Sequence, residues 1–225
     1  MSGEIQVFKP YSIEEGRFLV KLARKAVTEY LIHGKVIDPP SETPEKLLRD
    51  RYGVFTTIEV YLGPAHRELR GCIGFPQGYK NVATAVILSA IAAATEDPRF
   101  PPMTVDELSK VVFEVSILSP MELIKVEDPR DYLKHIKVGY HGLMIEKGFR
   151  SGLLLPQVPV EYGWDEETFL CETCIKAMLP PDAWLERDTR VYRFQAQIFM
   201  EVTPNGDVVE RDLVEELRLK KQQNP

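Results

Sequence analysis

Residues 53–75 read GVFTTIEVYLGPAHRELRGCIGF, and this stretch predicts two strands joined by a turn. Side chains alternate from Gly53 to Leu62 with the period of two that is typical of a strand. Gly63-Pro64 interrupts the pattern, and a second strand is expected over residues 68–75. The predicted hairpin therefore presents the run Leu69-Arg70-Gly71-Cys72-Ile73-Gly74, called the hexad below, beside its loop.

Helices are expected around this hairpin. Ser12 and Glu15 have the spacing of a capping box, which predicts a helix over residues 12–33 that ends at Gly34. Further helices are predicted over residues 81–96, 129–136, 165–178 and 210–225, with a short one after Thr104, and strands over residues 111–118, 143–146, 151–155 and 191–202. Residues 35–44 hold three prolines and predict an extended loop that runs on to the first strand.

This order of elements predicts the fold class. Strands and helices do not alternate in the regular manner of a doubly wound parallel sheet. We therefore expect an α+β fold with a mainly antiparallel or mixed sheet packed with helices.

Composition narrows the class of protein. The chain has 225 residues, of which 44% are hydrophobic and 28% charged, values typical of a folded globular protein. A net charge of −6 without a long basic block disfavours nucleic-acid binding. The longest apolar stretch, residues 82–94, is too short to span a membrane. Residues 1–10 lack the pattern of a secretory signal, so we expect a cytoplasmic protein.

Cys72 is the first candidate for chemistry. It stands between Gly71 and Gly74, which would let a ligand or another backbone approach closely. Arg70 lies two positions upstream, and a nearby guanidinium would favour the thiolate. The alternative is a cysteine buried in a tightly packed hairpin, as is common for this residue type. The sequence leaves both interpretations open.

Cys171 and Cys174 form a CxxC motif inside the helix predicted over residues 165–178. A redox CxxC places its first cysteine at a helix N-terminus, where the dipole lowers the thiol pKa. A single pair without a second one at ligand spacing is also a weak zinc signal. Packing in the core is the favoured interpretation, and no metal site is predicted.

Other polar residues are candidates for a binding site. His141 lies in a flexible turn, Gly139-Tyr140-His141-Gly142, where it is either a functional side chain or an ordinary exposed histidine. Arg99 either binds an anion or pairs with Asp97 or Glu96 at a helix end. Arg150 and Gln157 flank the run Leu153-Leu154-Leu155-Pro156 and its exit loop, which makes them candidates for the rim of a pocket.

A set of motifs in this order resembles a known family. The motifs are the hexad, Asp97-Pro98-Arg99-Phe100-Pro101-Pro102, Glu114-Val115-Ser116-Ile117-Leu118, His141-Gly142-Leu143, Arg150-Ser151-Gly152-Leu153-Leu154-Leu155-Pro156-Gln157-Val158, Trp164-Asp165 and Cys174-Ile175-Lys176-Ala177. In order and spacing they resemble the motifs of the AMMECR-type domain family, and the chain resembles a microbial member of that family. One departure is Met178, which stands where glycine is expected, and we expect it to continue the helix.

The resemblance implies a single domain over residues 1–225. Its core, about residues 12–202, would have a larger and a smaller subdomain with the hexad near the cleft between them, and residues 203–225 would be a charged C-terminal extension. The family has no established activity or cofactor, although members are fused to Memo-type domains or found beside radical-SAM proteins. A Memo-type or radical-SAM protein is thus one expected partner.

Two functional hypotheses follow. In the first, the protein is an enzyme in which the thiolate of Cys72 is the nucleophile, Arg70 stabilises negative charge and His141 is the base. In the second, it is a non-catalytic binding or regulatory module for a small metabolite or a partner protein, with Gly71, Gly74, Arg99, Arg150 and Gln157 as binding residues. A third function, RNA binding, is disfavoured by the acidic composition.

Overall fold

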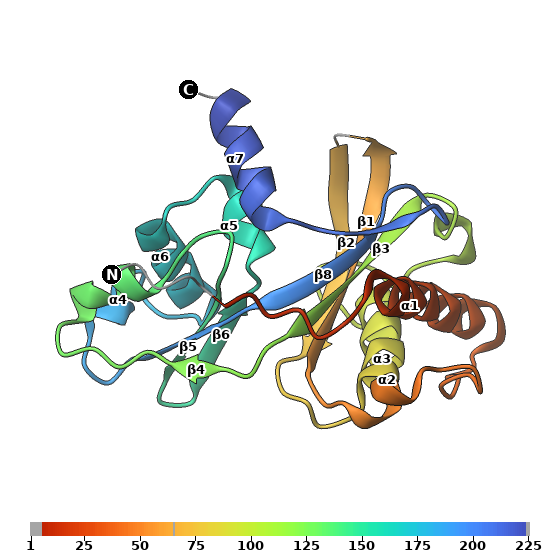
Figure 1. Ribbon diagram of the computed structural model, residues 1–225, viewed down its shortest axis with the longest axis horizontal. Coiled ribbons are helices and arrows are strands. Elements are labelled where there is room, and N and C mark those ends of the chain that lie inside the picture. The colour runs from red at the N-terminus through yellow and green to blue at the C-terminus, as the bar shows by residue number, and fades with distance from the viewer. Residues whose placement is uncertain (1–5, 65, 224–225) are drawn as a thin grey trace. The chain divides into compact units, whose positions relative to one another are not determined.

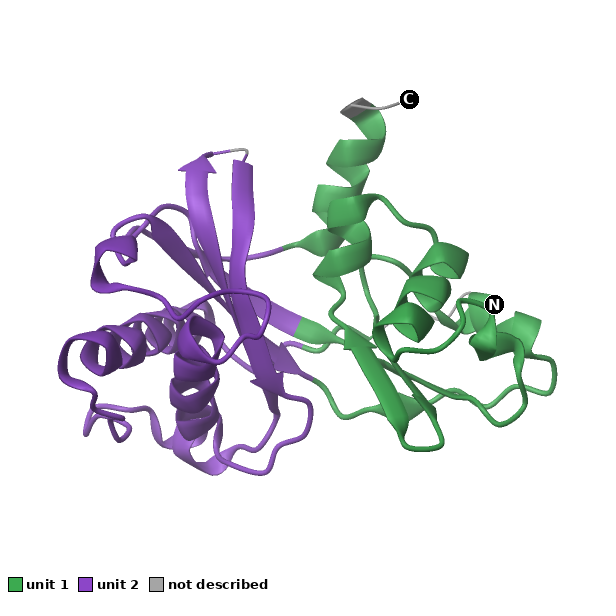
Figure 2. Cartoon of the chain, turned by 180° about the vertical axis from the view of Figure 1, so that it is seen from behind, with its two compact units in different colours: residues 1–8, 119–196, 212–225 green, residues 9–118, 197–211 purple. Residues whose placement is uncertain are grey.

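The computed structural model describes residues 6–64 and 66–223, which form two compact units (Figure 2). Unit 1 comprises residues 1–8, 119–196 and 212–225, and unit 2 comprises residues 9–118 and 197–211. Residues 1–5, which include half of the segment used to exclude a secretory signal, lie outside the described part. Among the described residues, no helix is long and apolar enough to cross a membrane.

Figure 1 labels most of the helices and strands that are named below. The helices are α1 (Ile13–His33), α2 (Glu45–Arg49), α3 (Val82–Thr95), α4 (Tyr132–His135), α5 (Gln157–Tyr162), α6 (Glu166–Lys176) and α7 (Leu213–Gln223), with 3₁₀ turns η1 (Val105–Glu107), η2 (Pro129–Asp131) and η3 (Ala183–Leu185). The strands are β1 (Gly53–Gly63), β2 (His66–Phe75), β3 (Val111–Leu118), β4 (Glu122–Leu123), β5 (Gly142–Lys147), β6 (Arg150–Leu154), β7 (Arg190–Phe194), β8 (Ala196–Glu201) and β9 (Val208–Glu210). This is an α+β fold, as the order of elements predicted.

Unit 2 is a five-stranded sheet in the order β2-β1-β3-β8-β9, with α1 and α3 packed on one face (Figure 1). The pairings of β1 with β2, β1 with β3 and β8 with β9 are antiparallel. On the helix side, the hydroxyls of Thr56 and Ser89 are 2.7 Å apart and Ile58 is fully buried. Because side chains alternate along β1, Thr57 lies on the face away from the helices.

The predicted capping box of α1 is confirmed. The Ser12 hydroxyl accepts the backbone N–H of Glu15, and the Glu15 carboxylate accepts the backbone N–H of Ser12. At the other end Gly34 adopts a φ of 64° and its N–H bonds to the carbonyl of Tyr30, so the helix ends where the glycine predicted. One buried ion pair anchors the helix, between Arg24 and Glu201 of β8 at 2.5 Å.

Unit 1 is a four-stranded antiparallel sheet in the order β4-β7-β5-β6. The predicted hairpin around Lys147-Gly148 is present as β5 and β6. Helix α6 packs on β6, where a Cβ on Gly152 would lie 2.3 Å from the backbone nitrogen of Ala177. Gly152 is therefore required by the close approach of α6.

The prediction of one long strand over residues 191–202 is wrong. The segment is divided into β7 in the sheet of unit 1 and β8 in the sheet of unit 2. Between them, the N–H of Gln195 bonds to the hydroxyl of Ser119 at 2.9 Å, and the Gln195 carbonyl accepts the Ser119 N–H at 2.9 Å. Side-chain alternation continues through the break, so periodicity alone does not reveal it.

Two short helices were missed. Helix α2 follows the predicted proline-rich loop, and its five residues are too few to show a helical period, although Leu47 is fully buried. Helix α5 replaces the exit loop expected after Pro156. Pro159 is accommodated there because it lies in the first turn, where the missing N–H would have no helical partner.

Met178 does not continue α6 as expected. It adopts a φ of 59°, the left-handed conformation usually taken by glycine, and the helix ends at Lys176. The N–H of Met178 bonds to the carbonyl of Ile175, and the N–H of Leu179 bonds to that of Cys174, both at 2.9 Å. These two bonds make a Schellman cap at the C-terminal end of α6. The cap therefore has the geometry that is usual with glycine, but a strained methionine occupies the glycine position.

We predict that Met178→Gly stabilises the protein by about 1 kcal/mol, because glycine relieves the left-handed strain. Met178 is 81% exposed, so removal of its side chain loses little burial. Met178→Ala is the matched control, since alanine removes the same side chain but keeps the Cβ. Urea unfolding measures both free energies, and an equal effect of the two substitutions would refute the strain argument.

Candidate functional site

The hexad lies in β2, which is an edge strand of the five-stranded sheet. Gly71 pairs with Ile58 and Leu69 pairs with Glu59, so Arg70 is the extra residue of a β-bulge. The alternation of side chains is thus broken at Arg70, contrary to the regular strand that the sequence predicted.

The two glycines of the hexad are required by packing. A Cβ on Gly71 would lie 2.0 Å from the carbonyl oxygen of Ala93 in α3, and one on Gly74 would lie 2.3 Å from Phe55 and from the carbonyl oxygen of Val54. Real Cβ atoms do not approach this closely, so either substitution would push the strand away from its neighbours. The sequence allows either a ligand or another backbone at these glycines, and at Gly71 the neighbour is the backbone of α3.

Asp97 ties the hexad to the end of α3. One carboxylate oxygen accepts the backbone N–H of Cys72 at 2.8 Å, which satisfies an outward-facing donor of the edge strand. Arg99 binds the same carboxylate through Nε at 2.9 Å and Nη2 at 2.6 Å. These bonds, with Arg99 first among the causes, lower the pKa of Asp97 to about 2. Arg99 therefore pairs with Asp97, one of the two roles that the sequence left open.

Arg70 is also used inside the unit. Its Nε lies 2.6 Å from the carboxylate of Glu107, and its Nη2 donates to the carbonyl of Pro101 at 3.0 Å. The guanidinium lowers the pKa of Glu107, and only 8% of Arg70 is exposed. Its charge is thus paired with a carboxylate of the same unit, and the stabilisation of a Cys72 thiolate by Arg70 stays a prediction.

The thiol of Cys72 lies on the face of the sheet away from α1 and α3. Its neighbours in the same row are Thr57, whose hydroxyl is 3.3 Å from the sulfur, and Glu114 of β3. Burial raises the pKa of the thiol to about 11, and the carboxylates of Glu114 and Asp97 add to the rise against the effects of Thr57 and Arg99. At pH 7 only about one thiol in ten thousand is then ionised. This shift is opposite to the one that a nucleophile needs.

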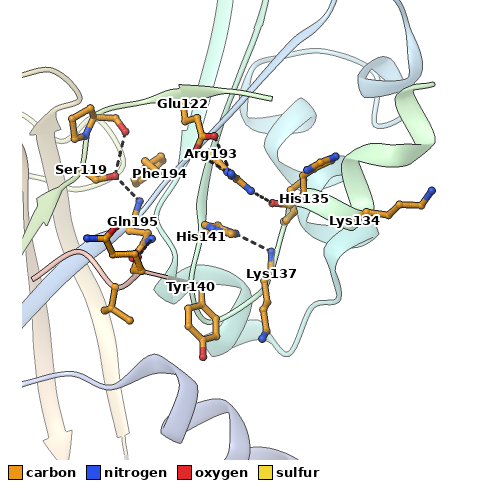
Figure 3. A pocket seen from close by; sticks show the side chains of 14 residues that line it. Ser119, Glu122, Lys134, His135, Lys137, Tyr140, His141, Arg193, Phe194 and Gln195 are labelled. Atoms are coloured by element: carbon orange, nitrogen blue, oxygen red, sulfur yellow. Dashed lines mark hydrogen bonds and ion pairs between the residues drawn. The ribbon is translucent and has the colours of Figure 1, made fainter. Parts of the chain in front are cut away.

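Unit 1 contains a separate pocket of about 1060 Å³, called the histidine pocket below (Figure 3). All of its walls come from unit 1: Gln6, Val7, Ser119, Pro120, Glu122, Lys134, His135, Ile136, Lys137, Tyr140, His141, Arg193, Phe194 and Gln195. Gln195 holds the N-terminal wall in place, because its side chain accepts the N–H of Phe8 at 2.8 Å and donates to the carbonyl of Gln6 at 2.8 Å.

His141 is the most buried titratable group of this pocket, with 6% of its surface exposed. Its Nδ1 accepts the backbone N–H of Lys137 at 3.0 Å, which assigns the proton of the neutral ring to Nε2. Burial, and then Arg193, lower the pKa of His141 to about 4, so the ring is neutral at pH 7. His141 is therefore a hydrogen-bond donor at Nε2, and the geometry does not favour it as a base.

The charged groups of the histidine pocket are arranged around Arg193. Its guanidinium bonds to both carboxylate oxygens of Glu122, at 2.9 and 3.0 Å, and to the carbonyl of His135 at 2.7 Å (Figure 3). Lys137 lies nearby with its ammonium 4.7 Å from the centre of the Tyr140 ring. The turn sequence pointed to His141 but not to these partners, because exposed lysines and a strand arginine carry no distinctive local pattern.

The remaining candidates of the sequence analysis lie elsewhere. Arg150 donates to the carbonyl of Met178 at 2.8 Å, and Gln157 is buried in α5. Both belong to unit 1 with His141, whereas Arg70, Gly71, Cys72, Gly74 and Arg99 belong to unit 2. A pairing of Cys72 with His141 stays a prediction.

The CxxC motif lies on α6. Cys174 is fully buried and Cys171 is half-buried, and both thiols are free. Burial raises the pKa of Cys174 to about 11, as core packing implies and a redox cysteine would not show. Among residues 6–64 and 66–223, no three His, Cys, Asp or Glu side chains gather as metal ligands would.

The chain is similar to several archaeal proteins. The sequence model of the AMMECR1 family matches residues 20–199. A protein of Caldivirga maquilingensis is 57% identical over 94% of this chain and 97% of its own length, and one of Thermococcus gammatolerans is 55% identical over 89% and 97%. The crystal structure of the uncharacterised protein PH0010 from Pyrococcus horikoshii has a TM-score of 0.85 and 52% identity, covering 88% of this chain and 97% of that one.

We predict that Asp97→Asn lowers the free energy of unfolding by roughly 2 kcal/mol at pH 7, because the folded protein holds this carboxyl at a pKa of about 2 against 3.8. A lowered pKa stabilises the fold above about pH 4, and this contribution is lost as the pH falls towards 2. The difference between wild type and variant in urea unfolding should therefore vanish over that range.

Asp106→Asn is the control, because Asp106 is an exposed carboxylate of the neighbouring turn η1. It should leave the free energy of unfolding unchanged within about 0.5 kcal/mol. A difference between wild type and Asp97→Asn that stays constant from pH 7 to pH 2 would contradict the proposed charge contribution of Asp97.

Proposed function

This chain belongs to the AMMECR1 family, and we propose that it is a non-catalytic binding module that holds a small molecule in the histidine pocket of unit 1. The proposal departs from the hexad as the centre of function. It agrees with the second of the two hypotheses only in being non-catalytic, because none of the binding residues named there lines the histidine pocket.

One observation carries the proposal: a histidine that is more than nine-tenths buried offers a ring nitrogen to a large pocket. Nε2 of His141 has no hydrogen-bond partner among the described residues, while Nδ1 is held by Lys137. Small-molecule sites combine a concavity of this size with a few fixed polar groups. A ligand acceptor would complete the hydrogen bonding of a ring that is already oriented.

The hexad supports the same proposal by contrast. Neighbouring segments of the chain occupy the space beside its glycines, and its arginine is paired with Glu107. The pKa of its cysteine is raised. A cysteine enzyme would need an accessible thiolate. These contacts favour a structural role for the hexad within unit 2.

A small molecule suits the histidine pocket better than a protein partner. Protein interfaces are broad surfaces of about 800 Å² on each side with an apolar centre. The walls of this pocket are concave and include charged, histidine and amide side chains. A Memo-type or radical-SAM partner, which the family resemblance suggests, would bind at another surface of the chain.

Binding is tested with a panel of simple carboxylates, phosphates, amines and neutral sugars, measured by calorimetry and by the rise in melting temperature. At least one class should bind the wild-type protein saturably. His141→Phe should abolish that binding, while His66→Phe, at an exposed position of β2, should retain it. Circular dichroism checks that both variants fold, and a panel in which no class binds the wild type would refute the proposed function.

The role of Cys72 is tested by alkylation with iodoacetamide from pH 7 to pH 11, followed by mass spectrometry. In the native protein Cys72 should react slowly at pH 7 and accelerate only towards an apparent pKa of about 11. In urea all three cysteines should react rapidly at pH 8.5. Fast native alkylation of Cys72 at pH 7 would restore the nucleophile hypothesis.

A further inference from the structure

The histidine pocket has more positive than negative side chains. Lys134, Lys137 and Arg193 line it with a single carboxylate, that of Glu122. Two of the cations are paired: Arg193 with Glu122 at 2.9 Å, and Lys134 with Asp131 at 2.6 Å. Lys137 has no carboxylate within ion-pair distance among the described residues. The positive charge left over in the pocket is therefore that of Lys137.

Lys137 and His141 are joined in one turn. The N–H of His141 bonds to the carbonyl of Lys137 at 3.0 Å, and the N–H of Lys137 bonds to Nδ1 of His141 at 3.0 Å. Gly139, between them, has a φ of 88°, which favours glycine. These reciprocal bonds fix the orientation of the ring. One short segment thus supplies both an oriented N–H donor and an ammonium that contacts the Tyr140 ring but no carboxylate of the described residues.

The charged side chains around the His141 imidazole also favour an anion. Arg193 and Lys137 both lower the pKa of His141 and Glu122 raises it, with Arg193 acting more strongly than Glu122. The electrostatic potential at the ring from these three side chains is therefore positive. A positive potential in a partly enclosed site attracts an anion and would repel an amine.

We propose that the histidine pocket is an oxyanion site, in which the carboxylate or phosphate group of a small molecule accepts the Nε2–H of His141 and is neutralised by Lys137. This inference rests on the proposed function and specifies its ligand class. His141 gives direction to the contact, whereas Lys137 supplies charge. The Arg193–Glu122 pair forms a wall whose charges are already matched (Figure 3).

The test is isothermal titration of the full chain with sulfate, inorganic phosphate and citrate, at constant ionic strength. Lys137→Met should weaken binding about tenfold or more, because a charge-assisted contact is lost. Lys134→Met is the matched control, since it removes the same charge from the same pocket at a residue that is already paired. It should weaken binding about threefold or less. Citrate binding without phosphate binding would assign a carboxylate ligand, and the reverse a phosphate.

A second measurement follows the side-chain resonances of His141 in the wild-type protein. This measurement does not depend on the folding of any variant. In ¹H–¹⁵N spectra of the histidine side chains, the anion should shift the Nε2 resonance of His141. Equal weakening by the two lysine substitutions, or an unmoved His141 resonance, would overturn the oxyanion site. If amines or sugars bind in the pocket and anions do not, the result would support the binding module and refute the oxyanion site.

Discussion

The close approach of α3 to β2 is the contact on which the arrangement of unit 2 depends. At Gly71 the carbonyl oxygen of Ala93 occupies the space of a Cβ, so the helix lies directly on the strand. This contact brings the end of α3 beside the hexad. There the carboxylate of Asp97 accepts the hydrogen bond of the outward-facing N–H of Cys72. A helix end thus does for this edge strand what a neighbouring strand would do elsewhere.

The bulge at Arg70 follows from the same packing. The extra residue lets the guanidinium reach Glu107 and Pro101 while Gly71 stays against the helix. The motif with the strongest sequence signal is therefore explained largely by contacts within unit 2. The histidine pocket has the opposite character, because its sequence signal is weak while Nε2 of His141 has no hydrogen-bond partner among the described residues.

Local sequence signals predicted the elements whose causes are local. The cap of α1 at Ser12, its end at Gly34 and the α+β class follow from side chains within a few residues of each other. The strand break at Gln195 could not be predicted this way, because its cause is Ser119, which lies 76 residues away along the chain. Likewise, Met178 takes a glycine conformation because the Schellman bonds and the packing of α6 on β6 determine the corner more strongly than local preference.

The sequence by itself determined the family, the fold class, the hairpin that carries the hexad and the turn that carries His141. Tertiary structure alone decided what those side chains are able to do. The thiol of Cys72 and the ring of His141 have pKa values of about 11 and about 4, and both shifts arise first from burial. Burial is produced by segments that are distant along the chain, so chemical reactivity depends on the folded environment and not on the motif.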